Sequence, residues 1–154
     1  MVEQKPPRMI DVSGKEVTLR TATATATVKM KPEVLTLLLE GRLPKGDAFQ
    51  VARIGAILGA KEARRLIPMC HVIPLHHIDV DFHPSPPDKI KIITSVRATA
   101  RTGAEMEAMI AAAAAALNIY DMCKGVDREI VIGDVKLLRK TGGKSGDFTA
   151  GPGK

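Results

Sequence analysis

Polar and apolar residues alternate along the chain from Val17 to Met30. Alanines and one arginine, Arg20, occupy one set of positions, and threonines occupy most of the other. A period of two residues is typical of a strand with one buried face and one open face. Two more segments, 78–82 and 89–97, alternate in the same way, and the proline-rich turn between them predicts a hairpin.

Helical spacing of apolar residues predicts three helices. The first, 33–40, lies between Pro32 and Gly41, because proline is tolerated at a first helical position and glycine favours a helix end. The second, 47–66, begins at an aspartate that can cap it and contains two glycines that give it a thin face. The third, 104–124, contains six consecutive alanines, which combine high helix propensity with little bulk.

A further strand over 130–138, broken at Gly133-Asp134, completes the order strand, helices, strand, strand, helix, strand. This order predicts an α+β fold of the ferredoxin-like split βαβ type, with an antiparallel sheet, helices on one face and an extra helix in the first crossover. No internal repeat is visible. We therefore expect residues 1–154 to form a single domain, with a flexible glycine-rich tail over 141–154.

Composition narrows the class of protein. The chain is 45% hydrophobic and 26% charged, as is ordinary for a soluble domain, and its net charge of +6 suggests an anionic partner. Aromatic residues make up only 3%, so the stacking platform of single-strand nucleic-acid binders is largely missing and a phosphorylated small molecule explains the charge at least as well. Two cysteines without CxxC spacing and a start that lacks a signal-peptide centre predict a cytoplasmic location.

Charged candidates stand at both ends of the alanine-rich helix. Asp121 and Lys124 share a helix face, either as an ordinary surface ion pair or as a partly buried pair suited to proton transfer. Glu105 and Glu107 stand at the other end, where acids also simply complement the helix dipole. Glu105 and Asp121 are 16 positions apart, or about 24 Å along the axis. If both ends serve one small ligand, the site needs a second subunit.

A second candidate is the pair Cys70 and His71, which lies in a connection bracketed by prolines. Thiol and imidazole can bind ligands, transfer protons or hold a metal, although a buried small hydrophobe is an equal interpretation of the cysteine. We predict no metal site, because these residues and the nearby His76 and His77 lack the spacings that bring zinc ligands together.

Lysines stand where phosphate oxygens can be held. Lys45 precedes a helix start, whose free N–H groups attract anions. Lys61 stands at a helix end, where a cation also complements the dipole. Lys140 and Lys144 flank a glycine loop that can close over an anion. The Gly-Lys-Ser of this loop is not a phosphate-loop motif, because the required earlier glycine is replaced by Leu138.

Together, these segments resemble the cyclic pyranopterin monophosphate synthase family, also called the molybdenum cofactor biosynthesis protein C family. The segments that carry the resemblance are 9–13, 45–47, 52–54, 66–71, 101–108, 119–124 and 142–146. Members of this family rearrange a cyclised guanosine triphosphate to cyclic pyranopterin monophosphate and release pyrophosphate, which is a lyase reaction. The resemblance implies the same reaction here, in a ferredoxin-like homohexamer built as a trimer of dimers with its pocket at a subunit interface.

The resemblance also implies a role for individual residues. Asp121 is implied as the catalytic acid/base, with Lys124 beside it and Lys45 opposite. The implied substrate-binding residues are Met69, Cys70, His71, Glu105, Met106 and Glu107, with Lys61, Lys140 and Lys144 on the phosphate side. We expect no metal site and no resident cofactor, apart from Mg²⁺ that can accompany the substrate phosphates.

Three residues depart from the family's usual pattern. Val72 follows His71 where proline is common, Glu62 stands where a basic residue often occurs, and Gly125 replaces the usual alanine after Lys124. Two other functions stay open at this point. The positive charge and the order of the elements leave open a basic ferredoxin-like module that binds nucleotides or RNA without catalysis. The three departures leave open a structural oligomer that has lost activity.

Overall fold

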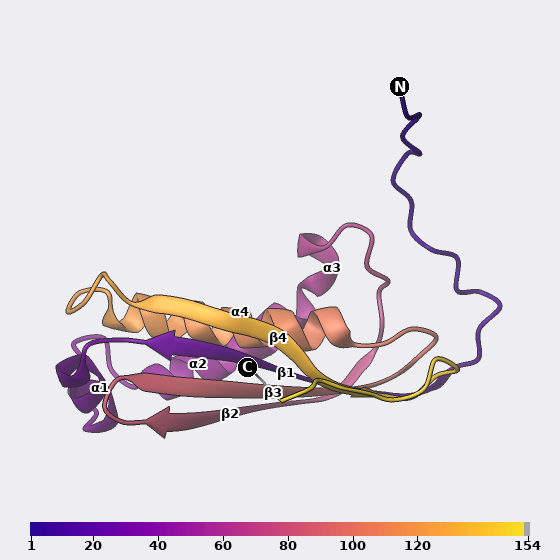
Figure 1. Ribbon diagram of the computed structural model, residues 1–154. Coiled ribbons are helices and arrows are strands. Elements are labelled where there is room, and N and C mark those ends of the chain that lie inside the picture. The colour runs from indigo at the N-terminus through magenta and orange to yellow at the C-terminus, as the bar shows by residue number, and fades with distance from the viewer. Residues whose placement is uncertain (153–154) are drawn as a thin grey trace.

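A computed structural model describes residues 1–152 and contains an open sheet with helices packed on one side (Figure 1). The elements are β1 (Thr18–Lys29), α1 (Pro32–Leu39), α2 (Ala48–Lys61), α3 (Ala63–Leu66), β2 (Leu75–Ser85), β3 (Lys89–Ala100), α4 (Glu105–Cys123), β4 (Val131–Thr141) and β5 (Phe148–Thr149). Both long helices, α2 and α4, run along the same face of the sheet (Figure 1).

The sheet has the strand order β2-β3-β1-β4-β5, and every neighbouring pair is antiparallel. In the centre, Ala24 of β1 lies opposite Thr94 of β3 and Leu137 of β4. The predicted α+β fold of the ferredoxin-like split βαβ type is confirmed, with α1, α2 and α3 all placed between β1 and β2.

The alternation of β1 divides its residues between the two faces of the sheet as predicted. Ala22, Ala24, Ala26 and Val28 are at most 1% exposed, and they pack under the helix layer. The threonines lie on the opposite face, where Thr25 is buried and donates a hydrogen bond to the Ile92 carbonyl over 2.8 Å. A strand of small residues brings the helices close to the sheet.

The alanines of α4 form the centre of the core. Five of them are fully buried against the sheet and α2: Ala108, Ala111, Ala112, Ala115 and Ala116. The α2 side of the contact is equally thin, since a Cβ added to Gly59 would lie 2.8 Å from the Cβ of Ala114. By length and composition alone α4 could cross a membrane, but in this fold it is half buried as the core helix.

Turn and cap residues explain where the elements end. The Asp47 carboxylate caps α2 by accepting from the Gln50 N–H over 3.1 Å, and Gly41 adopts a left-handed φ of 68° just after α1. The helix predicted over 47–66 divides into α2 and α3, with Glu62 at the junction. The predicted break in β4 is a bulge at Asp134, whose φ is 52°.

The chain beyond Thr141 turns back onto β4. Phe148 and Thr149 pair with Lys140 and Arg139, so β5 lengthens the sheet by a short strand inside the segment predicted as a tail. At the other end of the chain, the residues before β1 run along the outside of the molecule and away from its body (Figure 1).

Candidate active site

The predicted site residues lie at the two ends of α4. Lys45, Asp121 and Lys124 meet at its carboxyl end. Around its amino end lie Met69, Cys70, His71, Glu105, Met106, Glu107 and Lys140, with Lys61 and Lys144 in adjoining hollows. The structure therefore forms two clusters, and the length of α4 separates them.

At the carboxyl end of α4, Asp121 is held between two ammonium groups. Lys45, in the loop before α2, reaches the Asp121 Oδ2 atom over 2.9 Å and its carbonyl oxygen over 3.0 Å. Lys124 reaches the Oδ1 atom over 2.8 Å. Hydrogen bonds from Lys124 and Lys45, together with their charges, lower the pKa of Asp121 to about 2. The carboxylate is ionised at neutral pH, and all three side chains are about half exposed.

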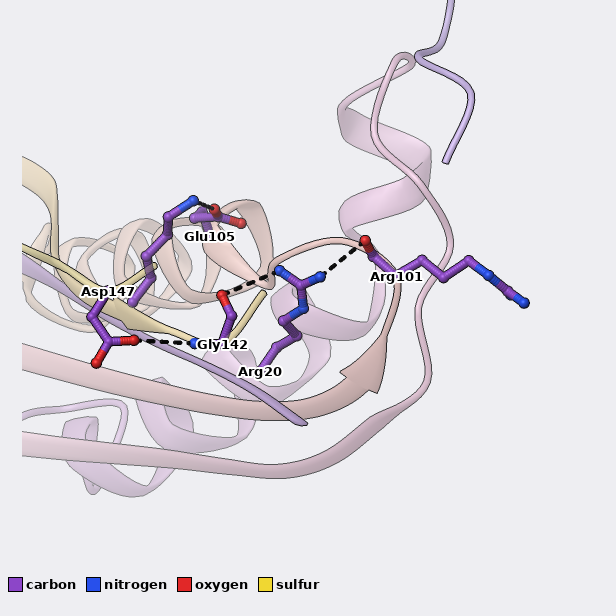
Figure 2. A network of polar contacts seen from close by, with 6 residues as sticks. Arg20, Arg101, Glu105, Gly142 and Asp147 are labelled. Carbon is purple, nitrogen blue, oxygen red and sulfur yellow. Dashed lines mark hydrogen bonds and ion pairs between the residues drawn. The ribbon is translucent and has the colours of Figure 1, made fainter. Parts of the chain in front are cut away.

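At the amino end of α4, Glu105 pairs with Lys140 of β4 over 2.8 Å (Figure 2). Burial by itself would raise the pKa of Glu105, but the hydrogen bond and charge of Lys140, with the charge of Arg20, lower the pKa overall. Glu105 is therefore an ionised carboxylate inside a partly buried ion pair.

Glu107, in the same helical turn, lies in a contrasting environment. It is only 4% exposed, its Oε1 atom accepts from the Cys70 thiol over 3.8 Å, and its Oε2 atom has no hydrogen-bond partner within residues 1–152. Burial, with the nearby charge of Glu105, raises the pKa of Glu107. Burial and the charge of Glu107 likewise raise the pKa of the Cys70 thiol. Two carboxyl groups with opposite pKa shifts can take different roles in acid/base chemistry.

Two hollows meet at Glu107 and His71. One, of about 330 Å³, is lined by Met69, Cys70, Met106 and both glutamates, with Ile10 and Lys15 on its outer side. The other, of about 240 Å³, is lined by Lys61 and Arg64. Carboxyl, imidazole, thiol and ammonium groups thus face one region that is large enough for part of a nucleotide.

Arg20 is a further candidate for the site that the sequence motifs did not single out. It is 8% exposed, and its guanidinium donates to the Gly142 carbonyl over 3.3 Å and to the Arg101 carbonyl over 3.1 Å (Figure 2). Its Nε atom has no partner among the residues described. Together with Lys15 and Lys144, it lines a hollow of about 450 Å³. The sequence did carry a signal, because Arg20 is the one charged residue on the alanine face of its strand.

The structure gives less support to a metal site or to a surface for nucleic-acid bases. Within the described part of the chain, no group of three or more His, Cys, Asp and Glu side chains is placed to hold a metal ion. His76 and His77 are exposed on β2, where His77 Nε2 lies 2.8 Å from Asp79. The central strands β1 and β3 carry no aromatic residue, so the open face of the sheet offers no platform for stacked bases.

Comparison with known proteins gives a consistent result. Residues 9–143 match the model of the MoaC family. A protein named cyclic pyranopterin monophosphate synthase from Geobacter metallireducens is 58% identical over 141 residues, or 91% of this chain and 88% of that protein. Proteins of the same name from Pelotomaculum thermopropionicum and Brevibacillus brevis are 52% and 48% identical over 95% and 97% of this chain, and the matches cover 86% and 93% of those proteins.

Proposed function

Because this chain belongs to the MoaC family, we propose that it is a cyclic pyranopterin monophosphate synthase of molybdenum cofactor biosynthesis. In this reaction a cyclised guanosine triphosphate rearranges to cyclic pyranopterin monophosphate and pyrophosphate leaves, which makes the enzyme a phosphorus-oxygen lyase. The observation that carries the proposal is the Lys45–Asp121–Lys124 cluster, in which two cations hold one carboxylate at distances of 2.8 to 2.9 Å.

The proposed reaction needs both ends of α4. Opening a purine-derived ring and closing a pterin ring takes several proton transfers, and loss of pyrophosphate needs cations on the phosphate oxygens. In one subunit the two clusters are about 24 Å apart, far beyond hydrogen-bond reach. We therefore propose that the carboxyl end of α4 in one subunit faces the amino end of α4 in another, within a homohexamer arranged as a trimer of dimers.

Asp121, Lys124 and Lys45 are the proposed catalytic residues. A carboxylate with a pKa of about 2 is a weak base, so in the free subunit Asp121 chiefly orients the two ammonium groups. Substrate phosphates that attract one lysine would raise the pKa of Asp121 toward its ordinary value. The same cluster can then both accept and donate protons.

The amino end of α4 is the proposed binding side. Met69, Cys70, His71, Met106 and Glu107 line the hollow that would receive the base. The proposed phosphate contacts are Lys61, Lys140 and Lys144, to which the structure adds Arg20 and Lys15 as neighbours of Lys144. The ion pair with Glu105 holds the Lys140 ammonium group at the amino end of α4.

No resident cofactor enters the proposal, because side chains supply the proton transfers, and Mg²⁺ would arrive with the substrate phosphates. We propose a cytoplasmic location. Cys70 and Cys123 are free thiols, which suits a reducing compartment.

The decisive experiment gives the purified protein the cyclised guanosine triphosphate and measures pyrophosphate together with the fluorescent oxidised pterin. We expect equal amounts of both products, and at most about a hundredth of that turnover from the Asp121→Asn variant. A folded wild-type oligomer that releases neither product would contradict the proposal and favour an inactive structural oligomer. Salt-sensitive binding of generic RNA by such a protein would instead identify a binding module.

A further inference from the structure

The segment 9–17, which we call the strap, forms one wall of the hollows around the amino end of α4. Ile10, Val12 and Lys15 line the hollow that contains Cys70 and Glu107. Met9, Val12 and Val17 line a neighbouring hollow of about 500 Å³ that also contains Cys70 and His71. Lys15 further borders the hollow of Arg20 and Lys144. The strap thus lines three of the hollows around the amino end of α4. The hollow of Lys61 and Arg64 is the one described here that it does not line.

Two side chains from the body of the protein hold the strap. His71 Nε2 lies 2.5 Å from the Ile10 carbonyl oxygen, and Arg101 Nε donates to the Lys15 carbonyl over 3.1 Å. Between these anchors the strap is stiffened locally, because the Ser13 N–H donates to Asp11 over 2.8 Å and the Lys15 N–H donates to the Val12 carbonyl over 3.0 Å. Apart from Val12 its residues are exposed, so the two anchors carry much of its attachment.

The anchor on His71 fixes where the proton of its imidazole lies. A carbonyl oxygen can only accept, so Nε2 must be the nitrogen that carries hydrogen. A neutral imidazole carries one proton, which leaves Nδ1 as a free acceptor. Within residues 1–152, Nδ1 has no hydrogen-bond partner, and the ring lines the same hollow as Glu107.

We infer that the strap is a positioning element: the Ile10 carbonyl holds His71 in its Nε2–H form, so that Nδ1 receives an N–H group of the purine-derived base. This inference rests on the proposed function for the identity of the base, but not for the attachment of the strap. Glu107 lines the same hollow with its Oε2 atom, which has no hydrogen-bond partner among residues 1–152. The acceptor nitrogen of His71 and the carboxyl group of Glu107 would together select a base whose ring edge offers matching hydrogen-bond donors and acceptors.

The attachment of the strap is tested by limited trypsin digestion of folded protein. Cleavage after Lys15 requires the strap to open, whereas cleavage after Arg8, in the exposed chain before it, serves as the internal reference. A glutamine at position 71 can place an amide N–H near the Nε2 position, whereas an asparagine is too short. We expect wild type and His71→Gln to cut slowly at Lys15, and His71→Asn and Arg101→Gln to cut roughly 5- to 10-fold faster.

A matched control is His76→Gln, because His76 is exposed on β2 and makes no hydrogen bond to the strap. This variant should digest like wild type. Equal rates at Lys15 in wild type, His71→Asn and Arg101→Gln, with unchanged melting temperatures, would overturn the attachment. Because digestion needs no substrate, its outcome is independent of whether the protein releases pyrophosphate.

The role of Nδ1 is tested by ¹⁵N spectra and by turnover. His71 should give one protonated Nε2 and one unprotonated Nδ1 signal, assigned by their loss in His71→Gln. Turnover of His71→Gln should fall at least about 10-fold although its strap stays attached, because the glutamine offers no acceptor at the Nδ1 position. A protonated Nδ1, or full turnover of His71→Gln in an active protein, would overturn the inference.

Discussion

Glu105 and Glu107 stand two residues apart in the first turn of α4, yet their surroundings shift their pKa values in opposite directions. Glu105 reaches the ammonium group of Lys140. Glu107 is buried beside a thiol, and one of its oxygens has no partner in the part of the chain that the structure describes. The helix turns the two side chains to different neighbours, because successive residues are rotated by about 100°. One short sequence therefore supplies an ionised carboxylate and a carboxyl that retains its proton more readily.

The contrast predicts opposite pH dependences of stability. A carboxyl whose pKa is raised in the folded protein contributes most below its unfolded value, and the contribution is lost as pH rises through the folded value. The difference in melting temperature between Glu107→Gln and wild type should therefore shift in favour of the variant as pH rises from about 4 to about 8. Glu105→Gln is the matched control. Its carboxylate contributes fully above the unfolded value and loses this contribution as pH falls, so the melting temperature of Glu105→Gln should decrease relative to wild type as pH rises up to about 5 and stay level above it. Differences that do not change with pH would contradict both expectations.

Asp121 provides a second test on a single side chain. Asp121→Asn keeps the shape but removes the charge that holds Lys45 and Lys124, so turnover should fall by roughly 100-fold or more. The melting temperature should change little, because exposed ion pairs contribute little to stability. Glu40→Gln breaks a comparable exposed pair, with Arg42 at 2.8 Å, and should keep full activity. Full activity of Asp121→Asn in the product assay would show that the carboxyl end of α4 is not the reacting site.

Among the helices, the contact of α2 with α4 leaves little room for added bulk at Gly59. The Cβ of Ala114 faces Gly59 there, and a methyl group on a helix backbone cannot rotate aside to make room. Such close approach holds the last turn of α2, with Lys61, against the first turns of α4. Packing and the position of a site residue are thus set by the same small side chains.

Gly59→Ala should destabilise the protein by about 1–3 kcal/mol, because the new Cβ would lie 2.8 Å from Ala114. Gly125→Ala is the control, since a Cβ there meets nothing within 4 Å, and it should stabilise by about 0.4–1 kcal/mol. Chemical denaturation of both variants measures the two changes. If the two variants changed the free energy of unfolding equally, α2 and α4 could move apart at little cost.

Most of these elements could be predicted because their signals are local. Alternation along 17–30 gave β1, the alanine run gave α4, and Gly133-Asp134 marked the bulge in β4. The division of the second helix at Glu62 had no glycine or proline to mark it. The pairing of β5 depends on an open sheet edge, which no window of sequence contains.

The candidate site was only partly predictable for the same reason. Asp121 and Lys124 are neighbours on one helix, so their spacing was sufficient. The contact of Lys45 with Asp121 joins residues 76 positions apart, and it entered through family resemblance rather than through local pattern. Arg20 was visible as a charge on an apolar face, but its partners Arg101 and Gly142 are brought to it only by the fold.

At the scale of the whole molecule, the main consequence of the fold is that one chain holds two separate clusters of candidate site residues, one at each end of α4. The carboxyl-end cluster is about half exposed, and the opposite end carries a buried carboxyl oxygen without a partner among the described residues 1–152. Covering both by a second copy would exclude water and strengthen the charge interactions of the site. A symmetric dimer would form two such sites at once.

Mixing subunits tests this arrangement. Asp121→Asn damages only the carboxyl end and Glu107→Gln only the amino end, so we expect each variant alone to lose turnover. Mixed oligomers of the two should then regain about a quarter of wild-type sites. Asp121→Asn mixed with Lys45→Ala is the control. Both changes damage the same end, so no activity should return. Failure of the first mixture to recover activity, when exchange of subunits is verified by mass spectrometry, would contradict a shared site.

Both ends of α4 are tied to other elements, Glu105 to Lys140 of β4 and Asp121 to Lys45 before α2. One inserted residue would turn one end against the other by about 100° and move it by about 1.5 Å. One of the two ion pairs would then break, and some of the buried alanines would no longer face the core. Insertions and deletions between Glu105 and Cys123 should therefore be absent from relatives that work as enzymes, whereas single substitutions other than at Glu105 and Asp121 would leave both ties in place.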